Sequence, residues 1–128
     1  LSLIRGLNAE SHLRLGEALR PLLNEKTLII GSGFSFHNLN AFSWRAVGAP
    51  DPDNDAFQDW LISTMTREAY QDTRAALRNW AQAPAARYCH PREEHLLPLL
   101  VCAALAQRSA EVLFDDRILG KRSLAFGW

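Results

Sequence analysis

An almost uninterrupted apolar segment from Leu96 to Ala106 places the strongest constraint on how this chain folds. It is well short of the roughly 20 residues that a membrane-spanning helix needs, so it predicts a buried helix, over 96–107. Pro98 locates the start of that helix near Glu94 or His95, because proline is tolerated only where its missing N–H would have no partner. His95 is therefore expected at the mouth of a buried helix, facing a cleft.

The composition is that of one globular domain. With 128 residues, 48% hydrophobic and 22% charged, the chain can bury a core and is not expected to be disordered. Its 14 Lys and Arg balance 14 Asp and Glu, so no basic excess exists for binding phosphates, and neither a nucleic-acid nor a membrane partner is expected. Two cysteines, Cys89 and Cys102, without a signal-peptide pattern, predict free thiols in a cytoplasmic protein.

Alternating apolar runs and helical periodicity predict an α/β fold, with a mixed sheet covered by helices. Short apolar runs at 1–4 and 27–30 predict two buried strands, and a helix over 9–23 with Asn8 as its N-cap lies between them. The order strand, helix, strand predicts a crossover unit. Further along, we expect a long loop over 34–55, a helix over 56–80 capped by Asp53 or Asp55 and interrupted near 63–66, and strands over 111–114 and 122–126.

The chain opens on Leu1-Ser2-Leu3-Ile4, which has the pattern of the middle of a strand. A trimmed sequence explains this simply. A domain that begins inside its own hydrophobic pattern is otherwise expected to lack the neighbour with which that pattern pairs.

Gly31-Ser32-Gly33, directly after the strand expected at 27–30, has two interpretations. Glycines let backbone N–H groups approach an anion, as in phosphate-binding loops. However, no third glycine and no Lys-Ser/Thr pair follows, and the segment continues into Phe34-Ser35-Phe36-His37 rather than a helix. A plain turn, in which the glycines supply positive φ, is therefore favoured over a small phosphate-binding protein.

Two histidine-containing segments are the candidates for chemistry. His37-Asn38 lies beyond the expected strand, where open α/β sheets bind ligands, and a near-neutral pKa suits His37 to proton transfer. The segment H-P-R-E-E-H over 90–95 offers imidazoles and carboxylates on a stiff element, which is typical of metal ligands. A structural role for His37, and a helix-dipole role for Glu93 and Glu94, remain the alternatives.

These two segments together resemble a known family. T-L-I-I-G-S-G-F-S-F-H-N-L over 27–39 and H-P-R-E-E-H-L-L-P-L-L over 90–100 are similar to the carboxyl-terminal half of the class III extradiol ring-cleavage dioxygenases, in the branch of DOPA 4,5-dioxygenase-like aromatic dioxygenases. The opening L-S-L, the segment H-L-R-L-G-E-A-L-R-P-L and the closing R-S-L-A-F-G-W resemble the same family. The resemblance therefore extends along the whole chain.

The resemblance implies a mononuclear non-haem iron(II) enzyme, with zinc as the alternative metal, that cleaves a catechol ring with O2. By this resemblance His95 corresponds to a metal ligand, and His37 to the acid–base histidine that lies beside the metal and is sometimes assigned to it. Asn38, His90 and Glu94 are then expected in supporting positions around them.

The sequence departs from the family in one respect. The family's other metal ligands lie in an amino-terminal half that is not present here, and His12, expected on the surface of its helix, matches neither motif. The resemblance thus implies that 1–128 is the carboxyl-terminal part of a catalytic domain and contains half of a metal site. Its partners are then a catecholic substrate, O2, and the missing amino-terminal half or a partner chain. A homo-oligomer is compatible with this, and a truncated, non-enzymatic interaction module is the alternative.

Overall fold

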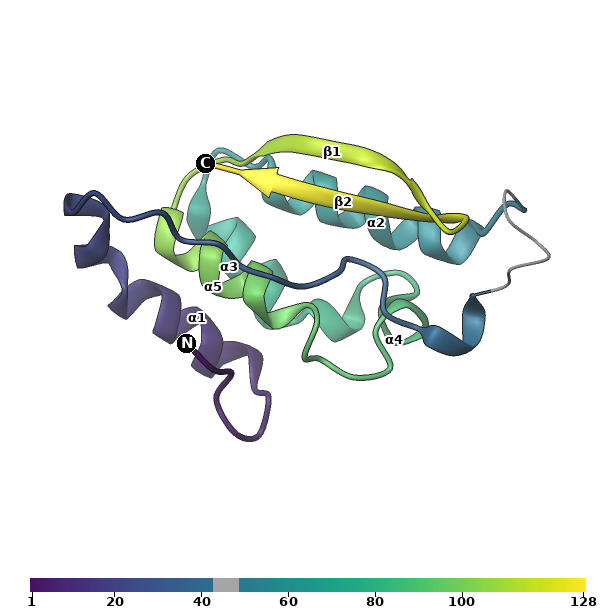
Figure 1. Ribbon diagram of the computed structural model, residues 1–128, viewed down its shortest axis with the longest axis horizontal. Coiled ribbons are helices and arrows are strands. Elements are labelled where there is room, and N and C mark those ends of the chain that lie inside the picture. Colours follow the sequence, from purple (N-terminus) through teal and green to yellow (C-terminus); the bar gives the residue numbers. More distant parts are fainter. Residues whose placement is uncertain (43–48) are drawn as a thin grey trace.

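The computed structural model describes residues 1–42 and 49–128 (Figure 1). The part of the predicted loop at 43–48 lies outside them. The elements, in chain order, are α1 (Ala9–Ala18), η1 (Arg20–Asn24), η2 (Leu39–Ala41), α2 (Pro52–Met65), α3 (Tyr70–Arg78), η3 (Trp80–Gln82), α4 (Ala86–Cys89), α5 (Leu97–Ala106), β1 (Glu111–Ile118) and β2 (Lys121–Gly127). None of the described helices is long and apolar enough to cross a lipid bilayer.

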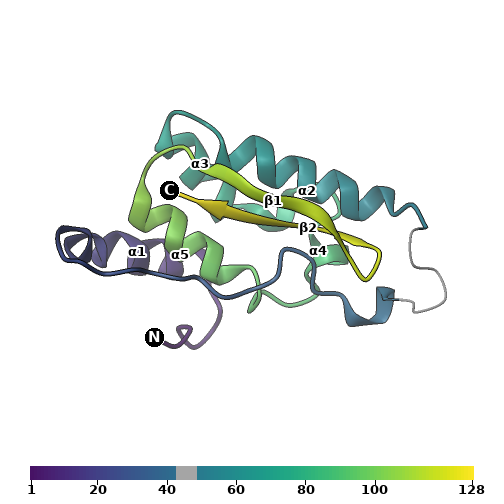
Figure 2. The same ribbon diagram turned by 45° about the horizontal axis from the view of Figure 1, so that its top comes forward.

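Helix α5 lies at the centre of the fold, with α1 along one side and an extended segment after η1 running beside it (Figures 1 and 2). Leu97 and Leu100 of α5 and Phe57 and Leu61 of α2 are fully buried in one core. Gly16 lets α1 approach α5 closely, because a Cβ there would lie 2.7 Å from the Ala104 Cβ. The apolar segment at 96–107 is therefore a core helix, as predicted.

The predicted α/β class is confirmed, but the sheet contains fewer strands than the sequence suggests. Strands β1 and β2 form a two-stranded antiparallel sheet, with Glu111 opposite Gly127 and Ile118 opposite Lys121. Residues 1–4 and 27–30 are not strands, so the predicted crossover unit is wrong. A buried strand needs a paired strand at its edge, and the described residues supply none to either segment.

Several helix boundaries differ from the sequence prediction for local reasons. Helix α1 has the predicted Asn8 cap, whose Oδ1 accepts the Ser11 N–H at 3.0 Å, but it ends at Ala18 and is followed by a 3-10 turn that contains Pro21. Helix α2 begins at Pro52, earlier than predicted, and Asp51 caps it instead of Asp53 or Asp55. The break between α2 and α3 falls just after the predicted position.

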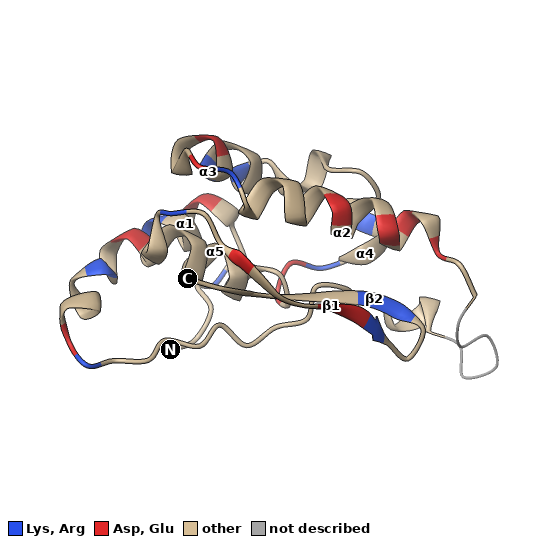
Figure 3. Ribbon diagram, turned by 90° about the horizontal axis from the view of Figure 1, so that it is seen from above, with Lys and Arg blue, Asp and Glu red and all other residues tan. Residues whose placement is uncertain are grey.

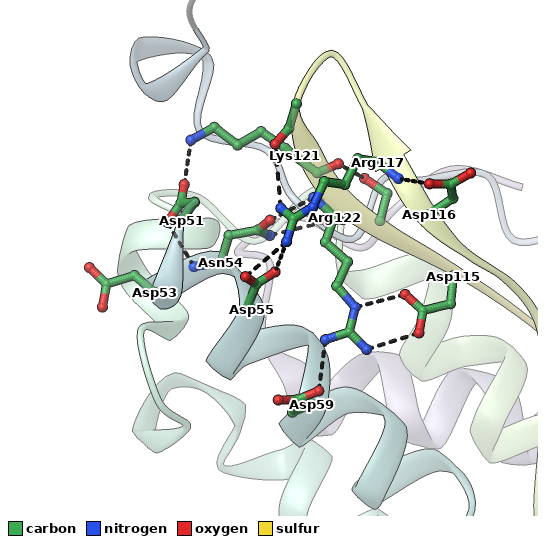
Figure 4. Close-up of polar contacts among 12 residues, drawn as sticks. Asp51, Asp53, Asn54, Asp55, Asp59, Asp115, Asp116, Arg117, Lys121 and Arg122 are labelled. Atoms are coloured by element: carbon green, nitrogen blue, oxygen red, sulfur yellow. Dashed lines mark hydrogen bonds and ion pairs between the residues drawn. The ribbon is translucent and has the colours of Figure 1, made fainter. Parts of the chain in front are cut away.

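The β-hairpin is fastened to α2 by polar contacts (Figure 4). Arg122 of β2 bridges Asp59 on α2 and Asp115 on β1, each at 2.7 Å, and Arg117 contacts Asp55 at 2.8 Å. The buried Asn54 side chain binds both the N–H and the carbonyl of Arg122, much as a neighbouring strand would. The charged residues of α2 are all acidic, whereas the hairpin carries charges of both signs (Figure 3).

His12 is buried, and its predicted surface position is wrong. One ring nitrogen, Nδ1, lies 2.7 Å from the Asn8 carbonyl, while Nε2 accepts the Ile4 N–H at 3.1 Å. The His12 ring therefore holds the loop before α1 against that helix. The polar neighbours of His12 in the sequence suggested a surface position. The sequence does not reveal the buried role, because both hydrogen bonds of the ring are to backbone groups.

Candidate metal centre

The structure brings His37 and His95 together from two distant segments. Their rings are stacked, with centroids 3.3 Å apart and planes inclined by 18°. The backbone explains the alignment: the Phe34 N–H donates to the His95 carbonyl at 3.2 Å, and the His37 N–H donates to the Cys89 carbonyl at 2.8 Å. The segment 34–37 thus lies along the stretch 89–95.

The glycines before this segment serve close packing against the start of α5. A Cβ on Gly31 would lie 2.6 Å from Cys102 Sγ and 2.8 Å from the Pro98 carbonyl oxygen, and one on Gly33 would collide with the His95 carbonyl oxygen. Positive φ among the glycines is found at Gly6 and Gly120, so the predicted left-handed role of Gly31 and Gly33 is wrong. Their small size, and not a phosphate, accounts for them here.

We expect Gly33→Ala to lower the free energy of unfolding by about 1–3 kcal/mol, because its Cβ would push against the His95 backbone. The neighbouring Ser32 is exposed, so Ser32→Ala is the matched control and should be nearly neutral. Urea denaturation of the three proteins measures the difference. Equal stability of the two variants would show that the close contact is not required.

The environment of His37 favours its neutral form. Burial lowers the pKa of His37, nearby His95 lowers it further, and the Glu94 carboxylate partly opposes both. A neutral imidazole has a free nitrogen that accepts a proton or binds a metal ion. His37 is only partly buried, so a ligand can reach it.

Asn38 and Glu94 lie close to the histidine pair in different ways. The Asn38 amide donates to the Tyr88 carbonyl at 2.8 Å, which ties the loop after His37 to α4. The Glu94 Oε2 is buried and lies 3.1 Å from Arg92 Nε, but in a geometry that makes no hydrogen bond. Glu93 instead pairs with Arg87 at the surface, at 2.7 Å.

His90, predicted to support the site, is fully buried. Its Nε2 lies 2.9 Å from the Ser35 carbonyl oxygen, to which it donates, and its Nδ1 has no hydrogen-bond partner among the described residues. The ring lies near those of Phe57 and Trp80. Burial lowers the pKa of His90 to about 4, so the ring is neutral at pH 7.

This burial predicts a pH dependence of stability. Unfolded His90 has an ordinary pKa of about 6.5, so the unfolded chain takes up a proton before the folded one does. Stability is therefore complete above about pH 6.5 and falls as the pH drops toward 4, by an amount on the order of 3 kcal/mol. Denaturation curves measured across this range should show the fall. His90→Gln should flatten it, and an unchanged slope in that variant would assign the effect to other groups.

The two cysteines are not suited to join the site. Both are free, as predicted, and Cys89 is fully buried. Burial raises the pKa of Cys89 to about 12 and also raises the pKa of Cys102, so both stay protonated at neutral pH. Thiols in this state are poor metal ligands.

An apolar groove of about 690 Å³ reaches the candidate site. Its walls come from the extended segment at 27–34, from α5 and from β2, and His95 lies at its edge. Leu28 and Ile30 on this segment are 83% and 77% exposed. No backbone hydrogen bond joins residues 28–33 to another part of the chain that the structure describes.

The donor set fits part of a non-haem metal site. Imidazole nitrogens suit iron and zinc, and the structure brings the two imidazole rings of His37 and His95 face to face. Within residues 1–42 and 49–128, no group of three or more His, Cys, Asp or Glu side chains is arranged to hold a metal ion. Tight binding of such metals needs three or four protein ligands, so these residues do not complete the site.

Curated proteins named as dioxygenases are similar to this chain over most of its length. The chain is 33% identical to dioxygenase tasH from Hapsidospora irregularis, over all of this chain and 42% of that protein. It is also 33% identical to 4,5-DOPA dioxygenase extradiol from Beta vulgaris, over 87% of this chain and 40% of the relative, and to that from Portulaca grandiflora, over 98% and 47%. No family model matches the chain.

One solved structure shares the fold. An uncharacterized protein from Escherichia coli K12 superposes with a TM-score of 0.78 at 24% identity, over 91% of this chain and 48% of that one. The two proteins therefore share the fold over most of this chain. The chain belongs to the extradiol dioxygenase family, and it spans less than half the length of these curated relatives.

Proposed function

We propose that this chain is the carboxyl-terminal part of an extradiol dioxygenase that opens a catechol-type aromatic ring with O2. The observation that carries the proposal is the stacking of His37 on His95, with ring centroids 3.3 Å apart. His95 is the proposed metal ligand, and His37 is the acid–base residue beside it. A reducing, cytoplasmic setting is part of the proposal, with which the free thiols of Cys89 and Cys102 agree.

The proposed metal is iron(II), with zinc as the alternative, since both accept imidazole ligands. When bound, the metal supplies adjacent coordination positions for the two catechol oxygens and O2. His95 holds one position from the mouth of α5, where its backbone carbonyl is fixed by the Phe34 N–H. The apolar residues of α5 that line the groove would help to exclude water once the groove is covered.

His37 carries the proton chemistry in this proposal. A catechol that binds through both of its oxygens would release its hydroxyl protons, one of them to neutral His37 and the other to solvent. The resulting imidazolium is stabilised by the nearby Glu94 carboxylate, which raises the pKa of His37 against the effect of burial. The same ring then returns the proton as the ring-opened product forms.

The remaining metal ligands are proposed to come from the missing amino-terminal half, in the same polypeptide or in a partner chain. The relatives are more than twice as long as the matched region, which leaves ample sequence to supply them. The segment 28–33, which has no backbone-to-backbone hydrogen bond to other described residues, is the proposed contact surface, because a strand from that half would pair with its backbone and cover Leu28 and Ile30.

A double substitution tests this contact surface. In the 128-residue chain, Leu28→Ser with Ile30→Ser should change the free energy of unfolding by no more than about 0.5 kcal/mol, because both side chains are exposed. In the complete assembly, which is this chain together with the missing amino-terminal half, the same change should lower the free energy of unfolding by about 2–5 kcal/mol, as for buried apolar residues. Leu39→Ser, also at an exposed leucine, is the control for both measurements. Equal effects in the two contexts would place the contact elsewhere.

Oxygen uptake tests the proposed reaction. The complete assembly, loaded anaerobically with iron(II), is mixed with catechols, including DOPA, and O2 consumption is followed together with loss of the aromatic absorbance. We expect one O2 consumed per ring opened. An assembly that retains no iron and consumes no O2 with any catechol would favour the second candidate, a non-enzymatic interaction module without a complete metal site, which the absence of a three-ligand group among the described residues supports.

A further inference from the structure

Ser35 is the meeting point of three parts of the fold. Its carbonyl oxygen accepts two hydrogen bonds, from His90 Nε2 at 2.9 Å and from Gln58 Nε2 at 3.0 Å. Its hydroxyl oxygen accepts the backbone N–H of Leu124 in β2 at 2.8 Å. Ser35 is thereby tied to α2, to the loop before α5 and to the hairpin.

These contacts fix the backbone that carries His37. The N–H of Phe34 is bound to the His95 carbonyl, the carbonyl of Ser35 is bound to His90 and Gln58, and the N–H of His37 is bound to the Cys89 carbonyl. The Phe36 side chain is fully buried and packs edge-on against Phe42 and Tyr88. Every residue of the segment 34–37 is therefore held by a contact, and the position of the His37 side chain on the backbone is fixed.

The two donors to Ser35 are costly residues to bury. His90 and Gln58 are both 0% exposed, and each leaves its other polar atom, His90 Nδ1 and Gln58 Oε1, without a hydrogen-bond partner among the described residues. An apolar side chain of similar size would avoid that cost. What an apolar residue could not provide is an N–H directed at the Ser35 carbonyl.

We propose that His90 and Gln58 are positioning residues, which hold the Ser35 carbonyl and so keep the His37 ring against His95. Neither touches the reacting atoms. The proposal deepens the proposed function, on which it rests for what His37 does, but the positioning itself is a property of the fold and is measured without any reaction.

Hydrogen exchange of the His37 amide in the 128-residue chain provides the test. His90→Gln keeps an N–H at about the position of Nε2, whereas the shorter side chain of His90→Asn does not reach it, so the two variants form a matched pair. Gln58→Met removes the second donor at similar volume. The amide of Ala104, in the core of α5, is the internal reference for global unfolding.

We expect His90→Asn and Gln58→Met to lower the protection of the His37 amide by at least tenfold relative to that of Ala104. His90→Gln should leave this ratio within about twofold of the parent protein. A purely structural role would lower both amides by the same factor, and this result, or equal behaviour of His90→Gln and His90→Asn, would overturn the proposal. Because each substitution leaves the other donor in place, the variants are expected to fold.

The active assembly separates this inference from the proposed reaction. There, His90→Asn should lower kcat by about 10- to 100-fold, as expected when a supporting residue is removed, while KM for the catechol changes little. His90→Gln should restore kcat. If no ring cleavage is found at all, the reaction fails and the exchange result still stands; if exchange is unaltered while kcat falls, the positioning role fails.

Discussion

Replacement of His37 by alanine is expected to lower kcat for ring cleavage by about 10²- to 10⁴-fold in the complete assembly, the range for loss of a general acid–base group. The reason is that His37 is the side chain stacked on His95 in the part of the chain that the structure describes, so no other group there is expected to take over its proton transfer. The metal content should stay close to that of the parent protein. Oxygen uptake with a catechol, together with metal analysis of the same sample, measures both quantities.

The pH dependence of the reaction gives a further check on His37. Since the neutral form accepts the proton and burial lowers the pKa of His37, activity should be kept at neutral pH and lost only as the pH falls below the ordinary histidine range. This acid limb should disappear in His37→Ala. Leu39→Ala, at an exposed residue close by, is the control and should retain full activity. An acid limb that persists without His37 would assign the proton transfer to another group.

His95→Ala is expected to abolish activity by removing the metal from the assembly. One imidazole out of a small ligand set is lost, and the affinity for iron or zinc falls accordingly. The His95 carbonyl, which holds the Phe34 N–H, remains in the variant, so the segment carrying His37 should keep its place. Metal content per chain and the midpoint of urea unfolding are the two measurements.

The ligand role of His95 depends on the combination of these two results. Metal lost with nearly unchanged stability of the metal-free protein is the expected outcome. An inactive variant that retains a full complement of metal would remove His95 from the ligand set. An inactive variant that is also strongly destabilised would assign to the ring a packing role instead.

The sequence predicted those elements whose signals are local. Asn8 at the start of α1, Pro98 near the start of α5 and the two closing strands all depend on residues next to them in the chain. The strands expected at 1–4 and 27–30 did not form, because a buried strand depends on neighbours from elsewhere. Their apolar pattern is nevertheless informative, since it leaves Leu28 and Ile30 exposed beside the candidate site.

The histidines of the candidate site were predictable from the sequence, but the residues that hold them in position were not. His37 and His95 stood out because they lie in motifs, and the structure brings them together. Ser35 and Gln58 were missed, because the Ser35 carbonyl oxygen accepts the hydrogen bonds and Gln58 acts by donating to it, and a sequence motif does not reveal bonds to the backbone. The buried residues of α2 also include the polar Asn54 and Thr64, so the helical pattern did not single out Gln58. His12 was misjudged for the same reason, since both its partners are backbone groups.

A metal titration of the 128-residue chain tests most directly the claim that it holds half of a metal site. Iron(II) under anaerobic conditions, and separately zinc, are added to the chain by isothermal titration calorimetry, and each sample is then supplied with a catechol and O2. We predict no stoichiometric, tight binding and no ring cleavage until the missing half is added. Binding of one iron(II) per chain with catechol cleavage by the chain alone would contradict the account.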